Sequence, residues 1–138
     1  DVQECTIYEI EKIAENLAIM GVAIVLLTGG EPFMRKDLPE IVRAFESRGI
    51  HVRMQTNGLA TEKQIEDVIE AGGKDISISL DTLTPKLQDH INGDFDDTWK
   101  KAILAMGMFM EKLPTEKSFA SIGCVLQNDN IGDIEDDN

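Results

Sequence analysis

The stretch DISISLD, residues 75 to 81, decides the fold because its side chains alternate strictly between apolar and polar. In an extended strand the three apolar residues point to one face, and Ser77, Ser79 and Asp81 point to the other. A parallel strand enclosed between two helix layers should be apolar on both faces. We therefore expect one face of this strand to meet helices and the other to meet a polar interior.

A second stretch, IHVRMQTNG at residues 50 to 58, shows the same alternation. Its polar positions include Arg53, Gln55 and Asn57, and these share a face. A curved, barrel-like sheet accommodates two such neighbours, because helices then cover only its outside and the polar faces line a hydrated lumen. An open, doubly wound sheet fits less well.

The remaining sequence predicts a regular alternation of helices and strands. Capping boxes of the form T-x-x-E/Q mark two helix starts, and further starts are indicated by a cap residue or proline before an apolar periodicity. The expected helices begin after Thr6, Asp37, Thr61, Thr84 and Asp97, with a last one near Ile131. The expected strands are residues 23–28, 50–56, 74–80 and 119–126. This order is typical of one α/β domain with a parallel sheet.

The overall composition narrows the classes of partner. The chain has 138 residues and a formal net charge of −13, which argues against nucleic acid or an anionic membrane as a partner. No apolar run approaches the ~20 residues of a membrane span, and the start does not resemble a signal peptide. Two cysteines, Cys5 and Cys124, form no disulfide framework and indicate a reducing cytoplasm. The start at Asp1 without a methionine suggests a piece of a longer protein.

The carboxyl ends of the expected strands are all polar, and ligands gather at this end of parallel α/β sheets. These ends are residues 28–31 (TGGE), 56–58 (TNG), 79–81 (SLD) and 127–128 (QN). Glu31 beside two glycines would give an acceptor-rich pocket for an ammonium group, and Asp81 could accept hydrogen bonds from a ribose. The pattern favours a zwitterionic, sugar-bearing ligand over a phosphate, since no P-loop motif is present.

Each of these features also has a simpler interpretation. Gly-Gly and Asn-Gly are common turn pairs, and Asp81 could cap the following helix. Another barrel enzyme could use Glu31 or Asp81 as a general base, and a binding module without catalysis is also possible. The histidines, His51 and His90, have no matched nucleophile, and we expect them to be structural or exposed.

Taken together and in order, these motifs resemble the radical S-adenosylmethionine (SAM) enzyme superfamily. The matching segments are TGGEP (28–32), QTNG (55–58), SISLD (77–81) and SIGCVLQNDNIGDI (121–134). The stretch from Ser77 to Phe95 is most similar to the branch that includes molybdenum-cofactor cyclases and peptide-modifying enzymes. The resemblance implies a (β/α)6 partial barrel, of which residues 1–138 would be the central part, truncated at both ends.

The resemblance also implies roles for individual residues. It assigns Gly29, Gly30 and Glu31 to the methionine amino group of SAM. It places Ser79 and Asp81 near the ribose or carboxylate, and Asn57 in the lumen near cofactor or substrate. The fifth family strand, here around Ile122 to Val125, would lie beside the adenine.

In this family a [4Fe–4S] cluster reduces SAM, and the resulting 5′-deoxyadenosyl radical abstracts a substrate hydrogen atom. The cluster is held by cysteines spaced C-x3-C-x2-C, and that loop is not in this sequence. We therefore expect no metal ligands in this chain and no radical chemistry from it alone. The substrate, a small molecule or a peptide, stays open. Four barrel strands would leave two edges unpaired, so we also expect self-association.

Overall fold

The computed structural model describes residues 4–114 and 116–132, which form one parallel sheet covered by helices. The four strands pair in the order β1-β2-β3-β4 and are β1 (Ile24–Leu27), β2 (His51–Thr56), β3 (Asp75–Ser79) and β4 (Phe119–Gly123). The helices are α1 (Ile7–Ile19), α2 (Leu38–Glu46), α3 (Glu62–Glu70), α4 (Pro85–Ile91) and α5 (Thr98–Lys112), and a short 3-10 helix, η1, spans Pro32–Met34. The expected order of helices and strands is confirmed.

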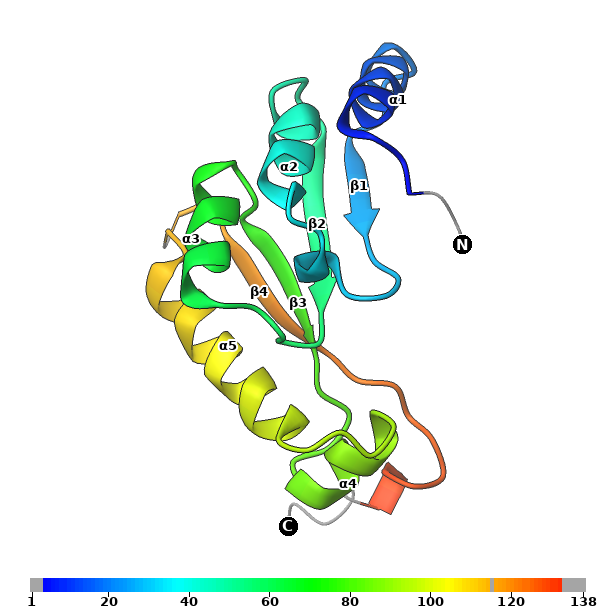
Figure 1. The fold of residues 1–138 in the computed structure, drawn as a ribbon, viewed down its shortest axis with the longest axis vertical. Helices are drawn as coiled ribbons and strands as arrows, with labels where there is room; N and C mark the ends of the chain where they lie inside the picture. Colours follow the sequence, from blue (N-terminus) through cyan, green and yellow to red (C-terminus); the bar gives the residue numbers. More distant parts are fainter. Residues whose placement is uncertain (1–3, 115, 133–138) are drawn as a thin grey trace.

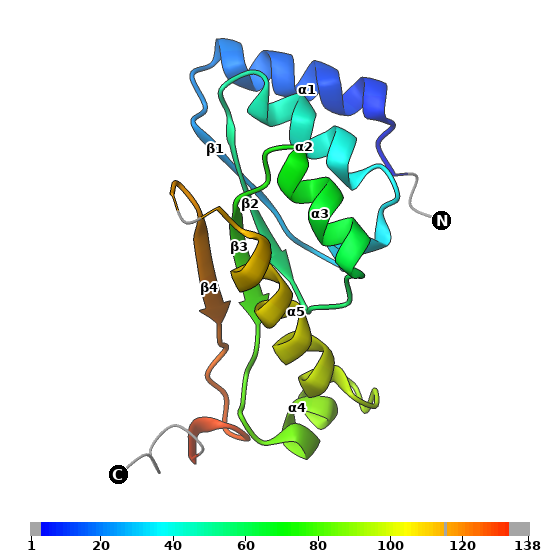
Figure 2. The same ribbon diagram turned by 90° about the vertical axis from the view of Figure 1, so that its left-hand side faces the viewer.

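The helices lie on one side of the sheet. Helices α2, α3 and α5 stand in a row beside the strands, α1 lies next to α2, and α4 lies beyond the carboxyl ends of the strands (Figure 1; Figure 2). Val52, Met54 and Ile76 face this helix layer and are fully buried. The open sheet with helices on one face is consistent with a partial α/β barrel, as the alternating strands predicted.

Polar side chains gather on the other face of the sheet. Register pairs Arg53 with Asp75 and Gln55 with Ser77 across β2 and β3, so these four side chains share that face. Arg53 Nη2 lies 2.9 Å from Asp75 Oδ2, and the guanidinium stacks over the Phe119 ring at 5.6 Å. The hydrogen bond to Asp75 raises the pKa of Arg53.

Helix α1 and helix α3 begin with the capping boxes that the sequence predicted. At each, a threonine hydroxyl accepts from the backbone of the residue three positions on, whose side chain accepts in return from the threonine N–H. The predicted cap by Asp37 is wrong, because the Asp37 carboxylate accepts from Arg35 and makes no cap bond to α2.

Strand β4 is shorter than predicted. It ends at Gly123 because its partner β3 ends at Ser79, and Leu80 N donates the last bond to Gly123 O. Residues 131 and 132 are helical, and the rest of the helix expected near Ile131 lies outside the described residues. In the part of the chain that the structure describes, no helix is long and apolar enough to cross a membrane. Both cysteines are free and exposed.

Candidate functional site at the carboxyl end of the sheet

The turn after β1 is held open by Glu31. Gly29 and Gly30 both have positive φ, 86° and 53°, a conformation that favours glycine. The Glu31 Oε1 atom accepts from Thr56 Oγ1 at 2.7 Å and from Phe33 N at 3.1 Å, while Oε2 accepts from Asn57 N at 2.7 Å. The carboxylate therefore ties the turn to the carboxyl end of β2, and the two glycines before it are exposed.

A hollow of about 530 Å³ lies against this turn. Gly29, Gly30 and Glu31 form part of its wall, together with Arg35 and Glu4. Much of the remaining wall is apolar and comes from β1, α1 and α2: Leu26, Leu27, Ile10, Leu38, Ile41 and Phe45. The volume falls in the range of small-molecule sites, and the mixture of apolar walls with a few polar groups is typical of them.

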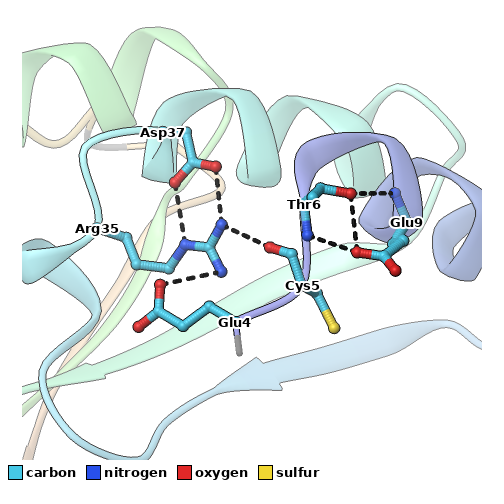
Figure 3. A network of polar contacts seen from close by, with 6 residues as sticks. All are labelled: Glu4, Cys5, Thr6, Glu9, Arg35 and Asp37. Atoms are coloured by element: carbon cyan, nitrogen blue, oxygen red, sulfur yellow. Dashed lines mark hydrogen bonds and ion pairs between the residues drawn. The ribbon is translucent and has the colours of Figure 1, made fainter. Parts of the chain in front are cut away.

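Arg35 anchors the segment that precedes α1 beside this hollow. Its guanidinium donates to both carboxylate oxygens of Asp37, at 2.9 and 2.8 Å, and to the Cys5 carbonyl at 3.0 Å. Glu4 lies 3.8 Å from the same guanidinium (Figure 3). The bidentate bond from Arg35 lowers the pKa of Asp37. Arg35 was not identified from the sequence, although an arginine two residues before an aspartate permits this pairing.

A second cluster forms where β3 and β4 end. Gln55 Nε2 donates to Ser79 Oγ at 3.3 Å across the polar face. Asp81 Oδ1 accepts from Val125 N at 2.8 Å, which joins the segments that follow the two strands. The polar face is tight here, since a Cβ on Gly123 would stand 3.2 Å from Ser77 Oγ. Asp81 does not cap α4, because its carboxylate is directed to the β4 side.

The structure brings some of the predicted site residues together and separates others. Gly29, Gly30 and Glu31 share the large hollow, and the Asn57 backbone joins them through Glu31. The Asn57 side chain instead accepts from Leu59 N and lines a separate hollow of about 210 Å³ beside α5. Ile122 pairs in register with the buried Ile78, so its side chain is on the helix side of the sheet rather than the polar side.

Comparison with known proteins gives the family. The model of the radical SAM superfamily matches residues 2–137. A probable GTP 3′,8-cyclase of Methanococcus vannielii is 34% identical over 121 residues, which cover 87% of this chain and 40% of that protein. A probable GTP 3′,8-cyclase of Pyrococcus abyssi is 40% identical over 85 residues, or 62% of this chain and 28% of the relative.

The chain belongs to the radical SAM superfamily. It spans less than half the length of these curated relatives. Members of this superfamily use SAM and a [4Fe–4S] cluster, and they are enzymes.

Of SAM and the [4Fe–4S] cluster, the residues present fit SAM. The glycine turn offers backbone acceptors for the SAM ammonium beside a hollow large enough for a small molecule. Among the described residues, no set of three His, Cys, Asp or Glu side chains could hold a metal ion. The Gly29-Gly30 turn and the hollow beside it are therefore the candidate site for SAM in the described part of the chain.

Proposed function

We propose that this chain is the SAM-binding part of a radical SAM enzyme, with SAM seated at the carboxyl ends of the strands. The observation that carries the proposal is the Gly29-Gly30 turn, which Glu31 holds beside a hollow of about 530 Å³. The family supports the same assignment. When bound next to a [4Fe–4S] cluster, the cofactor supplies a radical that abstracts a hydrogen atom from substrate.

The residues of this chain bind and orient the cofactor. Backbone carbonyls of Gly29 and Gly30 accept from its ammonium, and Glu31, which fixes the turn, lies in the wall of the same hollow. Ser79 and Asp81 supply hydrogen-bond acceptors from the end of β3. In this proposal Val125, whose N–H donates to Asp81 Oδ1, contacts the adenine. Ile122 would then contribute through its backbone, because its side chain faces the helix side of the sheet.

The geometry supports this assignment over a general-base enzyme. Both oxygens of Glu31 already accept bonds from backbone or hydroxyl donors, and Asp81 accepts from Val125 N. Three of the four oxygens of these two carboxylates therefore already take part in bonds within the chain. The two acids therefore suit a positioning role better than proton abstraction.

The test is SAM affinity of the full-length protein after cluster reconstitution, measured by calorimetry for two glycine variants. Gly30 and Gly21 both have positive φ, 53° and 76°, and a Cβ on either would meet no atom within 4 Å. The backbone cost of alanine is therefore matched, but Gly21 follows α1 at the opposite end of β1. Gly30→Ala should weaken SAM binding by about tenfold, which corresponds to about 1.4 kcal/mol. Gly21→Ala should leave it unchanged, and equal affinities for the two variants would contradict the proposal.

The relatives favour GTP as the first substrate to try. Both are named as probable GTP 3′,8-cyclases, and one covers 87% of this chain. Formation of 5′-deoxyadenosine by the reconstituted full-length protein should rise on addition of GTP if GTP is the substrate. An unchanged rate would remove GTP while leaving the proposed SAM site intact.

A further inference from the structure

Asn130 is a fully buried amide that joins the ends of β3 and β4. It lies in the turn after β4 and has no exposed surface. Its Nδ2 donates to the carbonyls of Asp81 and Val125, both at 2.8 Å, and its Oδ1 accepts from Gln127 N at 2.8 Å. Both donor hydrogens and the acceptor of the side chain are thus used. The two backbone segments that leave the sheet are held together where strand pairing has ended.

Gln88, a second buried amide, also bonds to Asp81, through the backbone N–H of that residue. It lies on α4, has no exposed surface, and its Oε1 accepts from Asp81 N at 2.8 Å and from Thr82 N at 3.0 Å. Among the residues that the structure describes, Gln88 Nε2 is buried without a hydrogen-bond partner. Leaving an amide nitrogen unsatisfied lowers stability, so packing alone does not explain a glutamine at this position.

Every polar group of Asp81 except one carboxylate oxygen is bonded within the chain, and the two amides hold both of its backbone groups. Its N–H is held by Gln88, its carbonyl by Asn130, and its Oδ1 by Val125 N. A nearly fully satisfied network that includes two fully buried amides restricts the backbone to one arrangement. Asp81 and Val125 are among the residues at this end of the sheet that the proposed function assigns to the cofactor.

We infer that Gln88 and Asn130 are positioning residues for SAM. They hold Asp81 and Val125 in the geometry that receives the cofactor's nucleoside, and they do not contact it themselves. The inference rests on the proposed function and adds two residues to that site. They lie on α4 and in the turn after β4, at the same end of the molecule (Figure 1).

The experiment measures SAM affinity of the full-length, cluster-reconstituted protein by calorimetry. Variants are Asn130→Ala, Gln88→Met and Gln88→Glu, with Val68→Ala in α3 as a control for lost stability, because Val68 is buried in the core away from this end. Displacing a binding group by about 1 Å is costly, so Asn130→Ala and Gln88→Met should weaken binding by about tenfold. Gln88→Glu keeps the acceptor oxygen and should restore most of the affinity lost in Gln88→Met.

A second readout separates positioning from general destabilisation. The electron paramagnetic resonance spectrum of the reduced cluster should be unchanged in these variants without SAM, and its change on SAM addition should require more SAM. Val68→Ala should need no more SAM than the parent. Affinities of Asn130→Ala and Gln88→Met within about twofold of the parent would overturn the inference.

If the two variants do not fold, hydrogen exchange on the unaltered protein decides instead. Binding of SAM should increase protection of the Asp81, Thr82 and Val125 amides, and unchanged protection would overturn the inference. A parent protein that binds no SAM would refute the proposed function itself, so the two failures are distinguishable.

Discussion

At the scale of single residues, the Glu31 carboxylate connects the turn after β1 to the carboxyl end of β2. Glu31→Gln keeps one acceptor oxygen but turns an amide NH2 toward a donor, Thr56 Oγ1 or Asn57 N. Leaving a partly buried donor unsatisfied costs about 1–3 kcal/mol. We expect urea denaturation of the full-length protein to show a loss of this size. Glu40→Gln, on the exposed face of α2, should change stability by less than about 0.5 kcal/mol. Equal losses of stability in the two variants would show that the Glu31 bonds do not stabilise the fold.

The sequence identified only part of this site, and the reason is the range of the interactions. Gly29, Gly30, Glu31 and Asp81 follow predicted strands directly, so their position at the sheet end could be expected from local sequence. Asn130 bonds to a backbone carbonyl 49 positions earlier in the chain. Nothing in the turn around Asn130 encodes that partner, and only the tertiary fold brings the two together.

The partners of acidic side chains are likewise set by the tertiary fold rather than by local sequence. The sequence predicts Glu31 at the methionine amino group of SAM, but the neighbours that hold its carboxylate are not set by its own position in the sequence. Its three donors come from η1 and from the carboxyl end of β2. Asp37 was expected to cap α2 and instead pairs with Arg35, since a bidentate guanidinium bond is stronger than a single cap bond.

At the scale of elements, the turn after β2 packs directly on α5. We therefore expect alanine to change the stability of the protein in opposite directions at two glycines, one in this turn and one on α5. A Cβ on Gly58 would stand 2.7 Å from the Ala102 Cα, and Gly58 also has φ of 85°. Overpacking against backbone costs about 1–3 kcal/mol, so Gly58→Ala should destabilise the protein in urea denaturation. Gly107 is exposed in the middle of α5 with no atom near its Cβ position, and Gly107→Ala should stabilise by about 0.5–1 kcal/mol. Two changes of the same sign would contradict this packing.

Helix α5 is capped by a residue of the preceding helix. Asp89 Oδ1 accepts from Thr98 N at 2.8 Å and from Thr98 Oγ1 at 2.6 Å, and it also accepts from Trp99 N. The Thr98 side chain first, and then the backbone N–H groups, lower the pKa of Asp89. Because the folded pKa is depressed, the stabilisation is present above the unfolded value of about 3.9 and is lost as pH falls through the folded value.

The loss of stability that follows from the lowered pKa of Asp89 can be measured by thermal unfolding at a series of pH values. Between about pH 5 and pH 2 the parent protein should lose more melting temperature than Asp89→Ala, which lacks the titrating cap. Asp96→Asn, at an exposed position in the loop between α4 and α5, should behave like the parent. Parallel curves for the parent and Asp89→Ala would show that the cap does not titrate in this range.

At the scale of the whole molecule, the sheet has a covered face and an uncovered one, and β1 and β4 are both edges (Figure 2). Ile24 and Leu26 of β1 are 54% and 51% exposed, and Ile122 of β4 is 52% exposed. Strict alternation along β2 and β3 foretold the polar face, but apolar side chains at the edges could not be assigned from sequence, because their exposure depends on which strands lie next to them.

Open edges of this kind lead us to expect that the isolated 138-residue chain self-associates. Leu26→Lys places a charge on the β1 edge and should reduce the particle size measured by light scattering at a given concentration. Leu104→Lys is the matched control, since it adds the same charge at a leucine that is 56% exposed but lies on α5 rather than on a strand. If association proceeds through the strand edges, only Leu26→Lys should suppress it. Equal suppression by both variants would assign the association to general surface hydrophobicity. A monodisperse monomer of the unaltered chain at high concentration would show that the strand edges do not cause self-association.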